Sequence, residues 1–216
     1  MTHSSLLPAR GLYAVTLDGE DHDAQRLQHA VAAALRGGAR LLQYRDKRNS
    51  RDQRARLAAG LLAQCRQARV PLIINDDLEL AAQLGADGVH LGLADAGLAE
   101  ARARLGPKAI IGITCANSLE RARAAAGGGA SYIALGAFFA SATKPNAPTA
   151  SLELLREARA ELTLPICAIG GITPDNGAAL LAAGADYLAV IGSLFGHDSV
   201  AAIETTASRF RDLFAD

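Results

Sequence analysis

Short apolar stretches alternate with longer Ala- and Leu-rich stretches along the whole chain. Short apolar runs bounded by turn residues are typical of strands buried on both faces, and the longer Ala/Leu-rich stretches are typical of helices. The first predicted helix follows the acidic turn 18–23 and closes at Gly37 and Gly38. The predicted strands are residues 12–16, 41–45, 71–75, 88–92, 109–114, 132–138, 165–171 and 187–193. The later predicted helices are residues 51–69, 78–84, 98–105, 119–126, 152–161, 176–183 and 200–213.

Eight strand-helix pairs in about 200 residues are the number expected for one closed parallel (βα)8 barrel of the TIM type. We therefore predict an α/β fold with one domain over residues 1–216, because the sequence has no linker or low-complexity tract. A doubly wound open sheet is the alternative fold. It rarely needs eight units and favours an early GxGxxG turn, which this sequence lacks.

A Gly-Ala pair precedes every second predicted strand, at Gly38-Ala39, Gly85-Ala86, Gly129-Ala130 and Gly184-Ala185. Glycine at that position can end a helix in the left-handed conformation, and the small alanine lets the chain turn inward. The recurrence indicates that the repeating unit is a pair of strand-helix units.

The amino-acid composition indicates which kinds of molecule the protein binds. Hydrophobic residues make up 50% of the chain, and Lys plus Arg equals Asp plus Glu at 22 each. The balanced charge gives no attraction to nucleic acid or membrane, so we expect small-molecule partners and a local anion site. Three widely spaced cysteines, with no signal peptide or long apolar segment, favour the reducing cytoplasm. Whether the chain forms a homo-oligomer stays open.

Ligand-type residues stand at the ends of the predicted strands, where such barrels have their active sites. The period of two in a strand predicts Gln43, Arg45 and Lys47 on one face of the second strand, as a cationic hydrogen-bonding surface. The alternative is an ordinary solvated strand end.

Carboxylates follow the third and fourth predicted strands. Asp76 and Asp95 are hard oxygen ligands, and two carboxylates with phosphate oxygens and water suit Mg²⁺. The alternative for an Asp after a strand is a helix N-cap, the role we assign to Asp77. His90 lies between apolar strand residues, which favours a hydrogen-bonded structural side chain over a ligand.

Glycines at the ends of the seventh and eighth strands, Gly170-Gly171 and Gly192, suit a phosphate cradle built from backbone N–H groups. Tight turns would need the same glycines. The loop 140–151 is rich in Pro, Ser and Ala, and its Thr143 and Lys144 favour a lid that closes over an anion.

Five ordered motifs together resemble the thiamine-phosphate synthase family. They are QYRDK at 43–47, INDD at 74–77, GADGVHLG at 85–92 followed by Asp95, SATKP at 141–145 and AIGGIT at 168–173. The resemblance extends from about residue 12 to residue 195. It implies a transferase that couples 4-amino-2-methyl-5-hydroxymethylpyrimidine diphosphate with a thiazole phosphate carboxylate, releasing pyrophosphate and CO₂ with the assistance of Mg²⁺.

The resemblance also implies roles for individual residues. The metal ligands would be Asp76 and Asp95, and the catalytic residues Arg45, Lys47, Thr114 and Lys144. The pyrimidine diphosphate site would consist of Gln43, Tyr44, Arg45, Asp46, Lys47, Asn75, Thr114 and Lys144. The thiazole phosphate site would consist of Ser141, Ala142, Thr143, Gly171, Ile191 and Gly192.

Four positions depart from the pattern that the family usually has. Thr114 replaces a serine and Ser141 a threonine, so both keep a hydroxyl. Leu93 replaces a glutamine, and Gly192 replaces a frequent serine, which would leave backbone contacts alone at that point of the phosphate site. Two alternative functions remain: a thiazole tautomerase-like relative, which needs a general base instead of a diphosphate clamp, and a non-catalytic thiamine phosphate binding protein.

Overall fold

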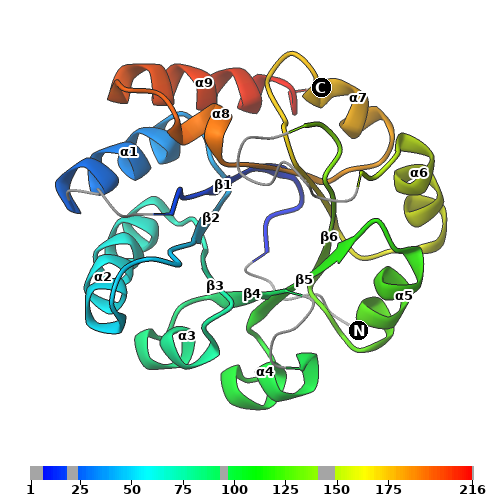
Figure 1. Cartoon of the computed structure of the whole chain (residues 1–216), viewed down its shortest axis with the longest axis horizontal. Helices are drawn as coiled ribbons and strands as arrows, with labels where there is room; N and C mark the ends of the chain where they lie inside the picture. Colours follow the sequence, from blue (N-terminus) through cyan, green and yellow to red (C-terminus); the bar gives the residue numbers. More distant parts are fainter. Residues whose placement is uncertain (1–6, 19–23, 93–96, 141–148, 216) are drawn as a thin grey trace.

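The strands form a closed barrel in the computed structural model, which describes residues 7–18, 24–92, 97–140 and 149–215. All eight strands are parallel and pair in sequence order, with β8 closing on β1, and the helices surround them (Figure 1). The predicted (βα)8 fold is confirmed. The extent of a single domain over residues 1–216 stays a prediction.

The strands are short and almost wholly buried. Their order around the barrel follows the sequence, and Gly11 pairs with Tyr187 where the barrel closes. The strands are β1 (Gly11–Val15), β2 (Leu41–Tyr44), β3 (Leu72–Asn75), β4 (Gly88–Leu91), β5 (Ile110–Ala116), β6 (Tyr132–Gly136), β7 (Ile166–Ile169) and β8 (Tyr187–Val190).

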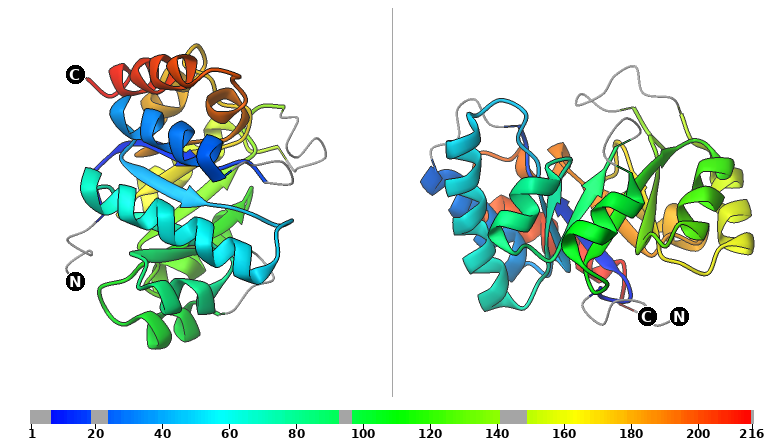
Figure 2. Two further views of the ribbon diagram at one scale, coloured as in Figure 1. Left: turned by 90° about the vertical axis from the view of Figure 1, so that its left-hand side faces the viewer. Right: turned by 90° about the horizontal axis from the view of Figure 1, so that it is seen from below.

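Helices follow the strands and cover their outer faces, as Figure 2 shows from the side. The first four are α1 (Ala24–Arg36), α2 (Arg51–Ala68), α3 (Leu78–Leu84) and α4 (Leu98–Leu105). The others are α5 (Leu119–Gly127), α6 (Leu152–Glu161), α7 (Gly177–Ala182), α8 (Gly192–Phe195) and α9 (Val200–Asp212). The sequence pattern did not predict α8, a single turn directly after β8.

The second strand ends earlier than the sequence predicts. β2 stops at Tyr44, so Arg45 and Lys47 lie in the loop that follows it. The backbone N–H of Arg45 donates to Thr16 Oγ1 (2.9 Å), and the Thr16 hydroxyl donates to the carbonyl of Arg45 (3.0 Å). The Thr16 side chain thus takes the place of a backbone partner for Arg45. Gln43, Arg45 and Lys47 therefore do not share one strand face, because the last two lie in a loop.

The Gly-Ala pairs behave as the sequence predicts. Gly85 ends α3 in the left-handed conformation (φ 60°), which a glycine adopts without the steric cost of a Cβ atom. The first glycine of each of the other three pairs also has positive φ. These pairs therefore stop a helix and return the chain to the barrel.

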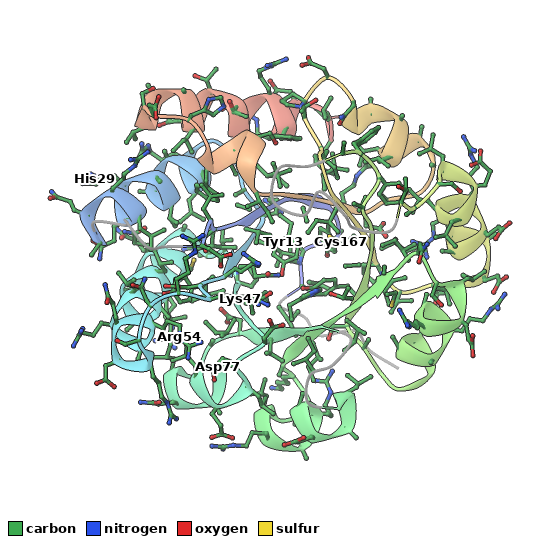
Figure 3. The ribbon with its side chains drawn as sticks, in the orientation of Figure 1. Tyr13, His29, Lys47, Arg54, Asp77 and Cys167 are labelled. Carbon is green, nitrogen blue, oxygen red and sulfur yellow. The ribbon has the colours of Figure 1, made fainter. Side chains whose placement is uncertain are left out.

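Two hydrophobic clusters fill the molecule. The larger lies between strands and helices, and the smaller fills the barrel interior around Tyr13, Tyr132 and Tyr187. Tyr13 and Cys167 lie inside the ring of strands in Figure 3. Cys115 and Cys167 are buried thiols, and burial raises the pKa of the Cys115 thiol to about 12. None of the helices in the described ranges has the length and apolar character needed to cross a bilayer.

The barrel interior depends on one close approach. A Cβ atom on Gly112 of β5 would lie 2.0 Å from the ring of Tyr132, whereas one on Gly127 of α5 would meet no atom within 4 Å. We predict that Gly112→Ala lowers the free energy of unfolding by about 2 kcal/mol or more, because overpacking a rigid core costs on that order. Gly127→Ala should be neutral or slightly stabilising. Urea unfolding of both variants measures the difference, and equal stabilities would contradict the packing.

Candidate active site

A cleft of about 520 Å³ opens beside the ends of β2 and β3. Five carboxylates and two cationic side chains line it, so the cleft has an excess of negative charge that favours cations at its wall. Lys47, Arg54 and Asp77 lie together on this side of the barrel in Figure 3. The lining residues are Asp46, Lys47, Arg54, Asn75, Asp76, Asp77, Leu78, Glu79 and Glu100.

Arg45 is held by a carboxylate from the end of β1. Its Nη1 lies 2.5 Å from Asp18 Oδ2, and the other oxygen of Asp18 accepts the backbone N–H of Lys47 (3.1 Å). The Arg45 side chain is only 12% exposed and that of Asp18 26%, so this ion pair is shielded more than a surface pair would be. Asp18 thus fixes the two basic residues relative to each other.

Lys47 and Asp76 both line the cleft and form an ion pair there. Lys47 Nζ lies 3.0 Å from Asp76 Oδ2, and the backbone of Asp76 has φ 61°, in the left-handed region that non-glycine residues rarely occupy. Its N–H donates to the carbonyl of His90 (2.9 Å), which ties the strained residue to β4. Strain of this kind gathers at functional sites.

Asp77 caps the following helix, as the sequence predicts. Its Oδ1 accepts the backbone N–H of Leu80 (2.9 Å), and its Oδ2 lies 3.4 Å from Arg54 Nη1. Asp77 is therefore occupied by α3 and α2, while the neighbouring Asp76 turns toward Lys47.

Tyr44 and Asp46 shape the loop after β2. The Tyr44 hydroxyl donates to Asp46 Oδ2 (2.8 Å), and the Asp46 carboxylate also accepts the N–H groups of Arg48 and Asn49 and the Asn49 side chain (2.7–3.0 Å). Burial alone would raise the pKa of Asp46, but the hydrogen bonds from Asn49 and Arg48 outweigh it and hold the pKa below its usual value. Their predicted contact with substrate stays a prediction.

Gln43, His90 and Thr114 lie on the inner side of the barrel. Gln43 Nε2 donates to the Tyr13 hydroxyl (2.8 Å), and His90 Nε2 lies 2.8 Å from Thr114 Oγ1. His90 is 8% exposed, which confirms a hydrogen-bonded histidine in the barrel interior.

Gly171 lies in the loop after β7, and Gly192 is the first residue of α8, just after β8. Gly171 has φ 62°, and a Cβ there would be 2.4 Å from the carbonyl oxygen of Ala140, so its turn needs glycine. The Ser193 hydroxyl of α8 donates to the carbonyl of Ile172 (2.5 Å), which joins α8 to the loop after β7. A Cβ on Gly192, next to Ile191, would meet no atom within 4 Å.

Several predicted site residues lie outside the described residues. They are Asp95, Ser141, Ala142, Thr143 and Lys144, together with most of the predicted lid. Within the described ranges, no group of three or more His, Cys, Asp or Glu side chains could hold a metal ion. The hard carboxylate and amide oxygens of Asp76 and Asn75 still fit Mg²⁺, which takes few protein ligands and completes its shell with phosphate oxygens and water.

Sequence reasoning missed Asp18, Tyr13 and Tyr132. Asp18 belongs to an acidic turn that reads as solvated, and only its distance to Arg45 reveals a role. The two tyrosines occupy ordinary strand positions far apart in the sequence, yet their hydroxyls are 2.7 Å apart. Alternation along a strand marks such side chains as inward, but nothing in it pairs them.

Comparisons with known proteins agree on one family. Residues 12–194 match the family described as thiamine monophosphate synthase. A thiamine-phosphate synthase of Methylobacillus flagellatus is 54% identical over 99% of this chain and 100% of its own length, and one of Marinobacter nauticus is 53% identical over 95% and 91%. A thiamine phosphate pyrophosphorylase structure from Pyrococcus furiosus has a TM-score of 0.85 at 29% identity, covering 97% of each chain.

The hydrogen bonds of Asp46 make a pH prediction. Because its folded pKa is depressed, its charge contributes stability above the unfolded pKa of about 3.9, and this is lost as pH falls through the folded pKa. Asp46→Asn should lower the free energy of unfolding by about 1–3 kcal/mol at pH 7. The gap from wild type should shrink below about pH 4.

Urea unfolding at several pH values measures this gap. Asp198→Asn is the control, since that side chain is wholly exposed, and it should match wild type throughout. A gap for Asp46→Asn that stays constant down to pH 3 would contradict the assignment.

Proposed function

Because this chain belongs to the thiamine monophosphate synthase family, we propose that it is an enzyme that makes thiamine phosphate. Its substrates are 4-amino-2-methyl-5-hydroxymethylpyrimidine diphosphate and a thiazole phosphate carboxylate. The products are thiamine phosphate, pyrophosphate and CO₂.

One observation carries this proposal: Lys47, Asn75 and Asp76 line a cleft where β2 and β3 end, and Asp18 holds Arg45 beside the backbone of Lys47. Arginine can grip two phosphate oxygens with its planar fork, and lysine adds a point charge. Both cations already have carboxylate partners in this structure, Asp18 and Asp76. A diphosphate with its metal would replace or share those carboxylates.

The reaction breaks the bond between the pyrimidine methylene carbon and the diphosphate oxygen. The electron pair leaves with the oxygen, and the methylene carbon becomes electrophilic. The lone pair of the thiazole nitrogen then forms the new C–N bond. The C–C bond to the carboxylate breaks to release CO₂, and the electron pair left on the thiazolium ring carbon takes up a proton from solvent. No protein nucleophile is required by this sequence of steps.

The roles of the side chains follow from where charge develops. Arg45 and Lys47 stabilise the negative charge that grows on the departing diphosphate, and preorganised charges of this kind generally supply the largest share of catalysis. Lys144, which lies outside the described residues, would join them. Thr114, Tyr44, Asp46 and Gln43 complete the pyrimidine side of the site.

Asp76 and Asp95 are the residues that would hold Mg²⁺. When bound, the ion neutralises charge on the diphosphate oxygens. The chain's own task is to keep Asp76 in the conformation that aims its carboxylate into the cleft, which the hydrogen bond to His90 supports.

The thiazole phosphate belongs at the loops after β6, β7 and β8. Gly171 lies in the loop after β7 and Gly192 begins α8, and a hydrogen bond from Ser193 of α8 to Ile172 joins the two segments. Ile191 lies between β8 and Gly192. Ser141, Ala142 and Thr143 would supply the remaining contacts.

The two alternatives make different demands. A thiazole tautomerase needs a general base and gains nothing from a basic pair at β2. A thiamine phosphate binding protein has no need of a strained metal carboxylate at Asp76. Arg45, Lys47 and Asp76 therefore favour the synthase.

The direct test is product formation. The purified chain with both substrates and Mg²⁺ should release thiamine phosphate and pyrophosphate, measured by chromatography, and dialysis against EDTA should abolish turnover. Tautomerisation of the thiazole without coupling, or binding of thiamine phosphate without turnover, would support an alternative instead. Activity that survives EDTA unchanged would contradict the metal assignment alone.

Arg45 gives a second prediction. Arg45→Lys should lower kcat/KM about 10- to 100-fold, because the ammonium group cannot hold two phosphate oxygens and Asp18 at once. Arg36→Lys is the matched control, since Arg36 also pairs with a carboxylate, Glu204, but lies on α1. Steady-state kinetics of both variants decide the matter, and wild-type kinetics for Arg45→Lys would make Arg45 a structural residue only.

A further inference from the structure

Five side chains form one continuous hydrogen-bonded chain across the barrel interior. Gln43 Nε2 donates to the Tyr13 hydroxyl (2.8 Å), and the Tyr13 and Tyr132 hydroxyls are 2.7 Å apart. His90 Nδ1 lies 2.9 Å from the Tyr132 hydroxyl, and His90 Nε2 lies 2.8 Å from Thr114 Oγ1. This hydrogen-bonded network starts at Gln43 on β2 and ends at Thr114 on β5, two residues that the proposed function assigns to the pyrimidine site.

The members of this chain are packed too tightly to change places. Tyr13 and Tyr132 are at most 1% exposed, and their rings meet edge to face at 5.8 Å. The Tyr132 ring also stacks on His90 at 5.6 Å and occupies the space that a side chain on Gly112 would fill. Each hydroxyl therefore has a fixed set of partners.

The tyrosines keep their protons. Burial raises the pKa of Tyr13 and of Tyr132 well above the ordinary value, so each hydroxyl is neutral and has one hydrogen to donate. A neutral imidazole likewise has one donor and one acceptor nitrogen. Counting these hydrogens shows which group donates in each hydrogen bond of the network.

Tyr13 already accepts a hydrogen bond from Gln43, so its own hydrogen goes to Tyr132. The Tyr132 hydrogen then goes to His90 Nδ1, which leaves the imidazole proton on Nε2, where it is donated to Thr114. With its oxygen engaged in this way, the Thr114 hydroxyl donates its own hydrogen outward. At the other end, Gln43 Oε1 has no partner among the described residues.

We propose that Tyr13, Tyr132 and His90 are positioning residues that fix an acceptor at Gln43 and a donor at Thr114, and thereby select an aminopyrimidine. This inference rests on the proposed function. The 4-amino group of the substrate donates to Gln43 Oε1. A 4-oxo pyrimidine presents an acceptor at the same place, and two facing acceptors leave both without a partner.

The chain could run the opposite way only if the Gln43 amide were rotated, with Oε1 accepting from Tyr13. It would then present an NH₂ donor alone and would favour the 4-oxo ring. The two directions therefore predict opposite selectivities, and the structure has Nε2 facing Tyr13.

The test compares the dissociation constants of the 4-amino pyrimidine diphosphate and its 4-oxo analogue, measured by calorimetry with Mg²⁺ and without the thiazole substrate. Wild type should prefer the amino compound by about 100-fold or more, since a site built for a hydrogen bond rejects a ligand that cannot make it. Tyr13→Phe removes the hydroxyl that holds Nε2, so the Gln43 amide can rotate and the preference should fall at least about 10-fold.

Two further variants complete the experiment. Tyr132→Phe interrupts the chain at its centre and should lower the preference as Tyr13→Phe does, so either variant serves if the other fails to fold. Tyr187→Phe is the matched control: this tyrosine belongs to the same cluster and packs on the Tyr132 ring, but its hydroxyl donates to the carbonyl of Pro8. It should keep the wild-type preference.

An unchanged preference in folded Tyr13→Phe and Tyr132→Phe, or a wild-type preference for the oxo compound, would overturn the inference. Turnover of the amino diphosphate, measured separately in wild type, tests the proposed function. Loss of one claim is therefore distinguishable from loss of the other.

Discussion

Parallel pairing of β1 with β8 closes the sheet into a barrel, so inward side chains that are distant in the sequence meet along one axis. Tyr13 on β1 then reaches both Gln43 on β2 and Tyr132 on β6. An open sheet would leave β1 and β8 as edges and would separate Tyr13 from Tyr132, although Tyr13 and Gln43 would still lie on neighbouring strands. The hydrogen-bonded network beneath the proposed pyrimidine site therefore depends on closure of the barrel.

Two ion pairs lie near these residues, and a bound ligand would replace one partner in each pair. Arg45 lies against Asp18, and Lys47 lies against Asp76. Each carboxylate holds its cation in place and offsets its charge, which allows basic residues to gather at one point of a chain with no net charge. A diphosphate that arrives with Mg²⁺ brings both signs of charge and can satisfy all four groups. Under the proposed function, binding would therefore be an exchange of charged partners within the folded structure.

The periodicity of apolar residues was sufficient to predict the barrel, because helix and strand patterns alternate without interruption and Gly-Ala pairs mark the turns. The end of β2 was not predictable from it: Thr16 replaces a backbone partner of Arg45, and no pattern in either segment encodes that contact. Asp77 could be recognised as a cap from its position before Leu78. Tyr13 and Tyr132 meet only because the barrel closes, and Asp18 meets Arg45 because the ends of the neighbouring strands β1 and β2 lie side by side. Residue type and spacing along the sequence did not reveal these contacts. Asp95, Ser141 and Lys144 lie outside the described residues, so their roles stay predictions.

We propose that the ion pairs beside β2 and β3 form a diphosphate site that works together with Mg²⁺. Calorimetric titration of pyrophosphate into the wild-type chain, with and without Mg²⁺, tests it most directly. Mg²⁺ should lower the dissociation constant at least about 10-fold, because a cation at Asp76 releases Lys47 to the anion. Asp76→Asn should remove most of this dependence. Equal dissociation constants in the two conditions for the wild-type chain would contradict it.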